Sequence, residues 1–440
     1  MRQRLVQVPL SLDYPYWVED PNFDLEYHVR HVALPKPGDW RQMCIQTARI
    51  FSRPLDLTRP PWEFTIIEGL DKVPGLPRGS YAMVTKIHHA AIDGKSGIDL
   101  MELLHTLSPD AAQPEEADDW RAEPIPTGLE LLARAQRNAL TNPFRQAKAL
   151  SQAMPGVARA IEGIANKASD LGSAGTPPNT RFNKTITPNR VVEGRQFPLD
   201  DIKAIRSLSD GCKINDVFLA IVGGALRIYL ESKAELPEDS LVAMAPISVR
   251  SAHEKGDMGN QVAAMLAPLG SHIADPRERL AFVHARTTNS KALTEALGAR
   301  EMSEISQSSP ALFMTLASKL NARLGLANFT NPAFNTIVTN VPGPPVPLYS
   351  VGVKLVGMQG LICLSDGMTL GHVVQSYDGQ ASITFTACRK ALPDPEFYSE
   401  CIQRSFGEMI AAATPPPTVT RRTAARSKSC LPKTNRKSQS

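Results

Sequence analysis

Residues 213–230 form an apolar segment that constrains what this chain can fold into. The sequence KINDVFLAIVGGALRIYL places apolar side chains nearly all round a helix, with Asn215 at the position of an N-cap. A helix without a polar face must be covered by other elements on several sides. Its apolar run at 217–226 is far shorter than the roughly 20 residues that span a bilayer. We therefore predict a buried core helix in a large globular protein.

Strand signals lie on both sides of this helix. Residues 61–70 (PWEFTIIEGL) are rich in aromatic and β-branched side chains, and residues 81–89 (YAMVTKIHH) alternate in the manner of a buried strand. The second half of the chain predicts strands at 241–250 and 334–341, and a hairpin at 369–389 around Asp378-Gly379. In the first half, after the strand at 81–89, an amphipathic helix is predicted from leucines at i, i+3, i+4 and i+7: Leu100, Leu103, Leu104 and Leu107.

Two segments predict linkers around a helical, alanine-rich stretch: a proline-rich, acidic one at 108–127 and a glycine- and proline-rich one at 172–180. Strands and helices alternate on both sides of them, which predicts an α/β protein of two lobes. The expected organisation is a first lobe at 1–120, a helical crossover at 121–180, a second lobe at 181–412 and a disordered basic tail at 413–440.

The charge of the chain is concentrated in that tail. Seven basic residues and no acid lie between Arg421 and Lys437, and removing these seven charges from the net charge of +4 leaves −3. A mildly acidic body argues against a nucleic-acid-binding core.

The six cysteines are scattered without a CxxC pair, so neither a disulfide framework nor a zinc site is indicated, and a reducing cytosol is expected. The first residues do not resemble a signal peptide.

Residues 88–94 (HHAAIDG) hold the main candidate for chemistry. Adjacent histidines at a strand end point to opposite faces, which disfavours a shared metal ion. In one interpretation the histidines are packed core residues and Asp93 caps the following helix. In the other, a neutral imidazole removes a proton from a hydroxyl group, and Gly94 lets the loop turn tightly. No GxSxG or reactive-cysteine motif accompanies them, which favours direct attack by an acceptor hydroxyl. Spacing alone does not decide between these interpretations.

Several blocks in a fixed order resemble the bacterial wax ester synthase/diacylglycerol acyltransferase family. HHAAIDG is similar to the HHxxxDG motif of that family, and RPPWEF at 59–64 is similar to its PLW block, with Pro61 in place of leucine. The resemblance runs from about residue 18 to residue 411. The later matching blocks are NDVFLAIVGGALR at 215–227, PISVR at 246–250, GNQVAAML at 259–266 and NVPGP at 340–344.

The resemblance implies a chloramphenicol acetyltransferase-like fold, with two α/β lobes, mixed sheets and a tunnel between the lobes. It makes His89 the general base and His88 a supporting residue. By the same resemblance, Asp93 holds the loop through an arginine, for which Arg250 is a candidate.

Three further positions are supporting residues on the same basis. Gly94 sets backbone geometry, and Asn260 could donate a hydrogen bond to the developing oxyanion. Asn215 is either a helix cap or a substrate contact.

The implied reaction is O-acyl transfer from acyl-CoA to diacylglycerol or a long-chain alcohol, without a metal or resident cofactor. A cytoplasmic location is expected, with peripheral contact to the inner membrane face or to lipid inclusions. Two alternatives stay open: a non-catalytic homologue that binds acyl-CoA or lipid, and another HxxxD acyltransferase of the superfamily. Family members also carry several tens of residues before the stretch matching 16–35, so we expect an incomplete first lobe or a truncated start.

Overall fold

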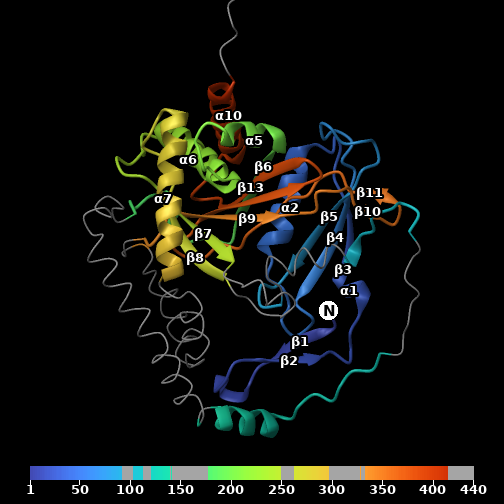
Figure 1. The fold of residues 1–440 in the computed structure, drawn as a ribbon. Helices are drawn as coiled ribbons and strands as arrows, with labels where there is room; N and C mark the ends of the chain where they lie inside the picture. The colour runs from blue at the N-terminus through green and yellow to red at the C-terminus, as the bar shows by residue number, and fades with distance from the viewer. Residues whose placement is uncertain are drawn as a thin grey trace, which may run out of the picture.

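A computed structural model describes residues 1–91, 103–111, 120–138, 140, 177–248, 262–296, 328 and 332–414. Two sheets organise this part of the chain (Figure 1). A three-stranded sheet in the order β3-β4-β5 forms the first lobe, and a six-stranded sheet in the order β6-β13-β12-β9-β7-β8 forms the second. Both sheets mix parallel and antiparallel pairs, as an α/β fold of two lobes requires.

The first lobe is built around β4, which lies between its two neighbours. β3 pairs with β4 in parallel, and β5 pairs with β4 antiparallel. The accompanying helix α2 begins with a capping box, in which the Gln42 amide donates to Asp39 Oδ1 at 2.8 Å. The elements of this lobe are β1 Gln3–Val6, η1 Pro9–Ser11, β2 Tyr16–Glu19, α1 Leu25–His28, β3 Val29–Ala33, α2 Trp40–Ser52, β4 Trp62–Glu68 and β5 Ala82–Ile87.

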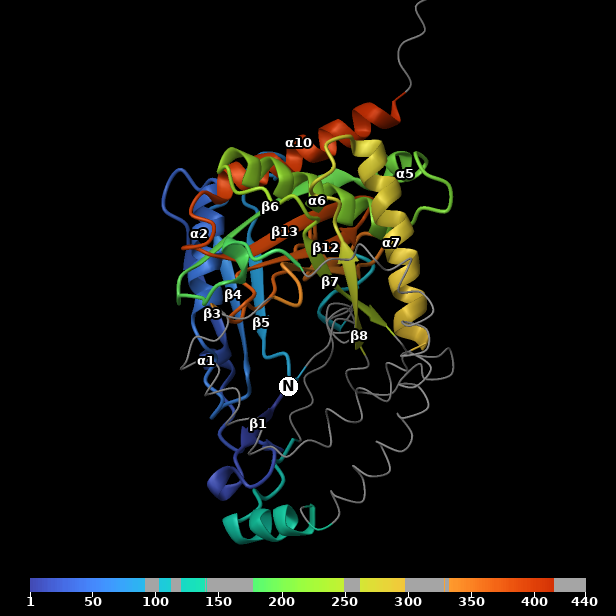
Figure 2. The same ribbon diagram turned by 90° about the vertical axis from the view of Figure 1, so that its left-hand side faces the viewer.

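The second lobe packs helices against its larger sheet (Figures 1 and 2). Its central helix is α6, Ile214–Ser232, which is buried along most of its length as the sequence predicts. A Cβ at Gly223 would lie 2.0 Å from the Leu269 carbonyl oxygen, so only glycine permits this close packing. The remaining elements are η2 Arg181–Asn183, β6 Arg190–Pro198, α5 Leu199–Arg206, β7 Val242–Ser248, β8 Val262–Pro268, α7 Pro276–Ala296, β9 Thr336–Pro342, β10 Tyr349–Ser350, β11 Val353–Lys354, β12 Leu370–Tyr377, β13 Gln380–Cys388 and α10 Pro395–Ala413.

The hairpin of β12 and β13 confirms the strongest local prediction. The strands pair antiparallel from Leu370 opposite Ala387 to Tyr377 opposite Gln380. Asp378 and Gly379 both have positive φ, at 42° and 77°, as a two-residue hairpin turn requires. The predicted strands in 61–70, 241–250 and 334–341 are also confirmed, as β4, β7 and β9.

Helix α2 joins the two lobes. Its first residue, Trp40, donates a hydrogen bond from Nε1 to Glu193 in β6, and its second, Arg41, pairs with Glu396 in α10. Glu193 is buried, and this burial raises the pKa of its carboxyl group. Burial and the neighbouring Glu193 also raise the pKa of the Cys44 thiol. The junction therefore depends on a buried hydrogen-bonded carboxyl group as well as on apolar contact.

Two expectations for the first lobe are wrong. The strand predicted at 81–89 is β5, an edge strand of its sheet whose side chains are half-buried or exposed rather than buried. Leu107 is not helical but 73 % exposed, next to a bridge between Thr106 and Tyr349, so the leucine spacing overstates that helix. The alternation at 81–89 was therefore right for the element type but not for its burial, whereas the leucine spacing was wrong for Leu107.

The predicted domain boundaries stay predictions. Residues 415–440, which contain the basic tail, lie outside the described residues, as do parts of both predicted linkers. Among the helices that the structure describes, none combines the length and the apolar character that crossing a bilayer demands.

Candidate active site

The PPW block and the histidine motif are neighbours in the first-lobe sheet. Trp62 at the start of β4 lies opposite Ile87 at the end of β5, and the Pro61 carbonyl accepts a hydrogen bond from the His88 amide at 2.9 Å. Trp62 is buried and stacks on His28 with ring centroids 4.4 Å apart. His28 Nδ1 lies 2.7 Å from the Trp62 carbonyl oxygen. This aromatic anchor fixes the strand ends from which the histidines project.

The two histidines occupy a turn directly after β5. The Ala91 amide donates to the His88 carbonyl oxygen at 2.9 Å, which closes the turn over His89 and Ala90. The Ala90 amide also donates to His88 Nδ1 at 3.2 Å, so a neutral His88 ring carries its proton on Nε2. His88 is half-buried and held at both backbone and ring, whereas the His89 side chain is exposed. This arrangement fits His88 as a positioning residue and leaves the His89 ring accessible.

Lys86 ties this end of β5 to the end of α2. Its ammonium group donates to the Ile50 carbonyl at 3.1 Å and to the Arg53 carbonyl, so it binds carbonyl groups at the C-terminal end of the helix. Burial lowers the pKa of Lys86. The histidine turn is therefore braced by β4 on one side and by the C-terminal end of α2 on the other.

Four of the predicted site residues lie outside the described residues: Asp93, Gly94, Arg250 and Asn260. Their roles, including the pairing of Asp93 with Arg250, stay predictions. The tunnel between the lobes also stays a prediction, since the described residues do not define it.

The predicted cap role of Asn215 is wrong. Helix α6 begins at Ile214, with Lys213 as its N-cap residue, two residues before Asn215. The cap contact is instead made by Asp216, whose Oδ2 accepts from the Lys213 amide at 2.9 Å. Asn215 is half-buried in the first turn, next to Asp216. A carboxylate also suits the positive end of the helix dipole.

Asp216 is the centre of a buried polar cluster that the sequence reasoning missed. His284 Nδ1 in α7 lies 2.9 Å from Asp216 Oδ2, and Thr287 donates to Oδ1 at 2.8 Å. Cys212 is close by. Its burial, and to a smaller extent the charge of Asp216, raises the pKa of its thiol to about 12. Possible ligand atoms of Cys212, Asp216 and His284 lie within 4.8 Å of one another. Both carboxylate oxygens are already hydrogen-bonded, so the cluster is explained as a tie between α6 and α7.

Comparison with known proteins agrees with the motif pattern. Residues 1–218 match the model of the wax ester synthase/diacylglycerol acyltransferase catalytic domain, and residues 258–410 match the C-terminal domain model of the same family. A Mycobacterium tuberculosis protein named as a diacylglycerol O-acyltransferase is 31% identical over 395 residues, which cover 89% of this chain and 76% of that protein. This chain belongs to the wax ester synthase/diacylglycerol acyltransferase family. The predicted resemblance is confirmed, and the chain is an acyltransferase by this membership.

Further relatives support the same assignment. A second M. tuberculosis protein with that activity in its name is 34% identical over 435 residues, covering 90% of this chain and 83% of the relative. Among solved structures, the wax ester synthase/diacylglycerol acyltransferase from Marinobacter aquaeolei VT8 has a TM-score of 0.65 at 26% identity. That match covers 94% of this chain and 86% of the other. The predicted two-lobe acyltransferase fold is therefore confirmed.

Proposed function

We propose that this chain moves a fatty acyl group from acyl-CoA to the hydroxyl group of diacylglycerol or of a long-chain alcohol. The products are triacylglycerol or a wax ester, together with free CoA. Family membership and the names of the relatives support this proposal. The observation that carries it is the position of His89, an exposed imidazole on a turn whose backbone is held from both sides.

In this proposal His89 acts as the general base. The imidazole takes the proton of the acceptor hydroxyl group, and the oxygen attacks the thioester carbonyl carbon. The tetrahedral intermediate then expels the CoA thiolate as the carbon–sulfur bond breaks, and the imidazolium returns the proton to that thiolate. Asn260 is the candidate donor to the oxyanion, while Asp93 and Gly94 shape the loop. The proposed steps need no metal or resident cofactor, and acyl-CoA enters as a co-substrate.

A thiol-release assay tests this function. The purified full chain is supplied with a long-chain acyl-CoA and with diacylglycerol, hexadecanol or no acceptor, and both CoA thiol and ester are measured. We expect thiol release that depends on an acceptor and matches ester formation. Binding of acyl-CoA without any release would instead indicate a non-catalytic lipid-binding homologue. Release only from a carrier-protein thioester would indicate another acyltransferase of the superfamily.

We further propose that the protein contacts a lipid surface peripherally, through a leucine tip formed by Leu10, Leu12, Leu129 and Leu140. The loop around η1 and the helix at 128–138 lie side by side at one end of the molecule (Figures 1 and 2), and Asn138 donates to Asp13 at 2.7 Å. Leu10 is 83 % exposed and Leu129 is 80 % exposed. Leu10 also has a positive φ of 59°, a backbone strain that functional positions often store.

Vesicle sedimentation tests the leucine tip. In the double variant Leu10→Asp, Leu129→Asp, we expect binding to vesicles of phosphatidylcholine and diacylglycerol to weaken about tenfold or more, because each leucine contributes roughly 1.5–3 kcal/mol when it leaves water. Leu103→Asp, at an exposed leucine outside the tip, is the matched control. Equal binding by the double variant and the control would contradict the proposed contact.

A further inference from the structure

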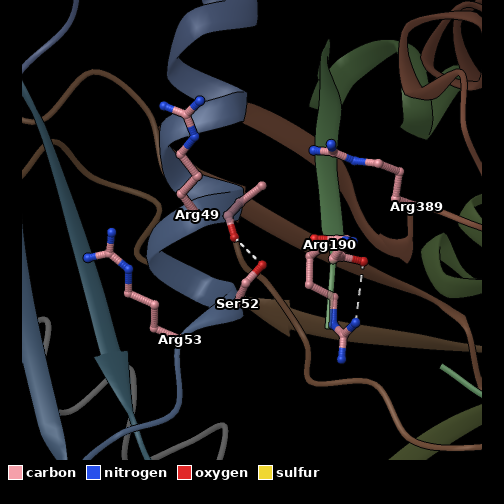
Figure 3. A pocket seen from close by; sticks show the side chains of 7 residues that line it. Arg49, Ser52, Arg53, Arg190 and Arg389 are labelled. Carbon is pink, nitrogen blue, oxygen red and sulfur yellow. Dashed lines mark hydrogen bonds between the residues drawn. The ribbon is translucent and has the colours of Figure 1, made fainter. Parts of the chain in front are cut away.

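Four arginines from both lobes line one shallow pocket. Its volume is about 190 Å³, and its lining includes Arg49, Ser52 and Arg53 of α2 together with Arg190 and Arg389 of the second lobe. In Figure 3 Ser52 lies between α2 and Arg190, while the four arginine side chains extend in different directions around the pocket. Arg49 and Arg53 are four residues apart, at the last turn and the end of α2. Arg190 begins β6 opposite Cys388, and Arg389 follows directly after β13. The pocket therefore lies at the junction of the lobes.

The positive charge of this pocket is not balanced by protein groups that the structure describes. Within those residues, none of the four arginines forms an ion pair with a carboxylate. Arg190 donates instead to the backbone carbonyls of Thr187 and Asn189, and burial lowers its pKa. Like charges around one pocket repel one another, and a bound anion offsets that repulsion. Guanidinium groups are the side chains best suited to hold phosphate, through paired charge-assisted hydrogen bonds.

The pocket lies on the histidine side of the first lobe. Lys86, three residues before His89, donates to the Arg53 carbonyl, so α2 meets β5 at the end that carries the histidine turn. CoA holds its phosphates at the end of the molecule remote from its thioester. An acyl-CoA donor therefore requires a phosphate subsite that lies near the histidine but is separate from it. The volume suits a phosphate group and is far too small for a whole CoA molecule.

We propose that Arg49, Arg53, Arg190 and Arg389 bind the phosphate groups of the acyl-CoA donor. This inference rests on the proposed acyl transfer and assigns it a donor subsite that spans both lobes. The arginines bind and orient the donor, and they take no part in the proton transfer at His89. Because α2 supplies one half of the pocket and the strands β6 and β13 supply the other, donor binding and the lobe junction are coupled.

Comparison of two donors tests the subsite. Acyl-CoA carries the phosphates, whereas the matching S-acyl-pantetheine has the same thioester without them. For Arg49→Ala, Arg389→Ala we expect the ratio of kcat/KM for acyl-CoA to kcat/KM for acyl-pantetheine to fall about tenfold or more, as loss of charge-assisted hydrogen bonds predicts. Arg78→Ala, at an exposed arginine in the loop before β5, should leave the ratio unchanged. Salt should lower the same ratio in the unmodified protein.

Each other outcome has a definite meaning. An equal fall with both donors, or no fall, would overturn the phosphate subsite while leaving the proposed acyl transfer intact. If the unmodified protein released no thiol from either donor, the proposed function would be refuted. Phosphate binding could still be measured in that case by equilibrium dialysis with 3′,5′-ADP. We expect this binding to weaken in the double variant Arg49→Ala, Arg389→Ala. Weaker binding to phosphatidylglycerol vesicles with an unchanged donor ratio would show that the arginines hold lipid phosphate, and would overturn the assignment to CoA.

Discussion

Replacing His89 by alanine should lower acyl transfer by about 10²- to 10⁴-fold, the usual contribution of a general base. The turn that presents His89 is formed by backbone hydrogen bonds of His88 and Ala91, which the substitution leaves in place. The His89 side chain is exposed, so its removal opens no cavity. The loss should therefore appear in kcat for ester formation, with little change in the free energy of unfolding.

A second histidine of the same sheet provides the control. His31 is exposed on β3, the opposite edge strand, and its Nε2 pairs with Glu68 at 3.2 Å. His31→Ala should retain the rate of the unmodified protein. If folded His89→Ala released CoA thiol at a rate within a few fold of His31→Ala, the histidine turn would not contain the base. Equilibrium dialysis measures the binding of acyl-CoA to both variants, and it therefore separates a loss of chemistry from a loss of binding.

The elements of the core could be predicted from the sequence because their patterns are local. Helix α6 is apolar on all sides, and the turn at Asp378-Gly379 requires positive φ at two successive positions. The burial of β5 could not be predicted in this way. Its alternation is correct for a strand, but whether either face is covered depends on elements that are distant in sequence. A strand at the edge of a three-stranded sheet has fewer neighbours than its pattern suggests.

The candidate site also combines residues that are contiguous in sequence with residues that only the fold brings together. The histidine motif was found because its residues are contiguous, and the family resemblance then separated His89 from His88. The arginines of the proposed phosphate pocket lie at positions 49, 53, 190 and 389, and no sequence spacing relates the pair on α2 to Arg190 or Arg389. Asp216 was overlooked beside Asn215, although asparagine and aspartate are about equally preferred as cap residues. Its partners on α7, His284 and Thr287, are 68 and 71 residues away and are visible only in the fold.

Asp216→Ala should therefore destabilise the protein by about 3 kcal/mol, the scale expected when one partner of a buried polar cluster is removed. The substitution leaves the Lys213 amide, the Thr287 hydroxyl and the His284 ring without their shared acceptor. Asp216 is only 3 % exposed, so water cannot easily replace it. It also removes a negative charge from the first turn of α6, where the helix dipole favours one.

Urea unfolding of Asp216→Ala should show a lower midpoint at an unchanged m-value, because the same surface is exposed on unfolding. Asp200→Ala is the matched control, since this aspartate of α5 is largely exposed and its pair with Lys203 contributes only about 0–1 kcal/mol. A double-mutant cycle with His284→Ala should give a coupling free energy of about 1 kcal/mol or more, since the two side chains share one hydrogen bond. Equal midpoints for Asp216→Ala and Asp200→Ala would mean that α6 and α7 are held by apolar packing alone.

A folded Asp216→Ala protein should keep its ratio of acyl-CoA to acyl-pantetheine activity, because the cluster ties two helices of the second lobe and does not line the arginine pocket.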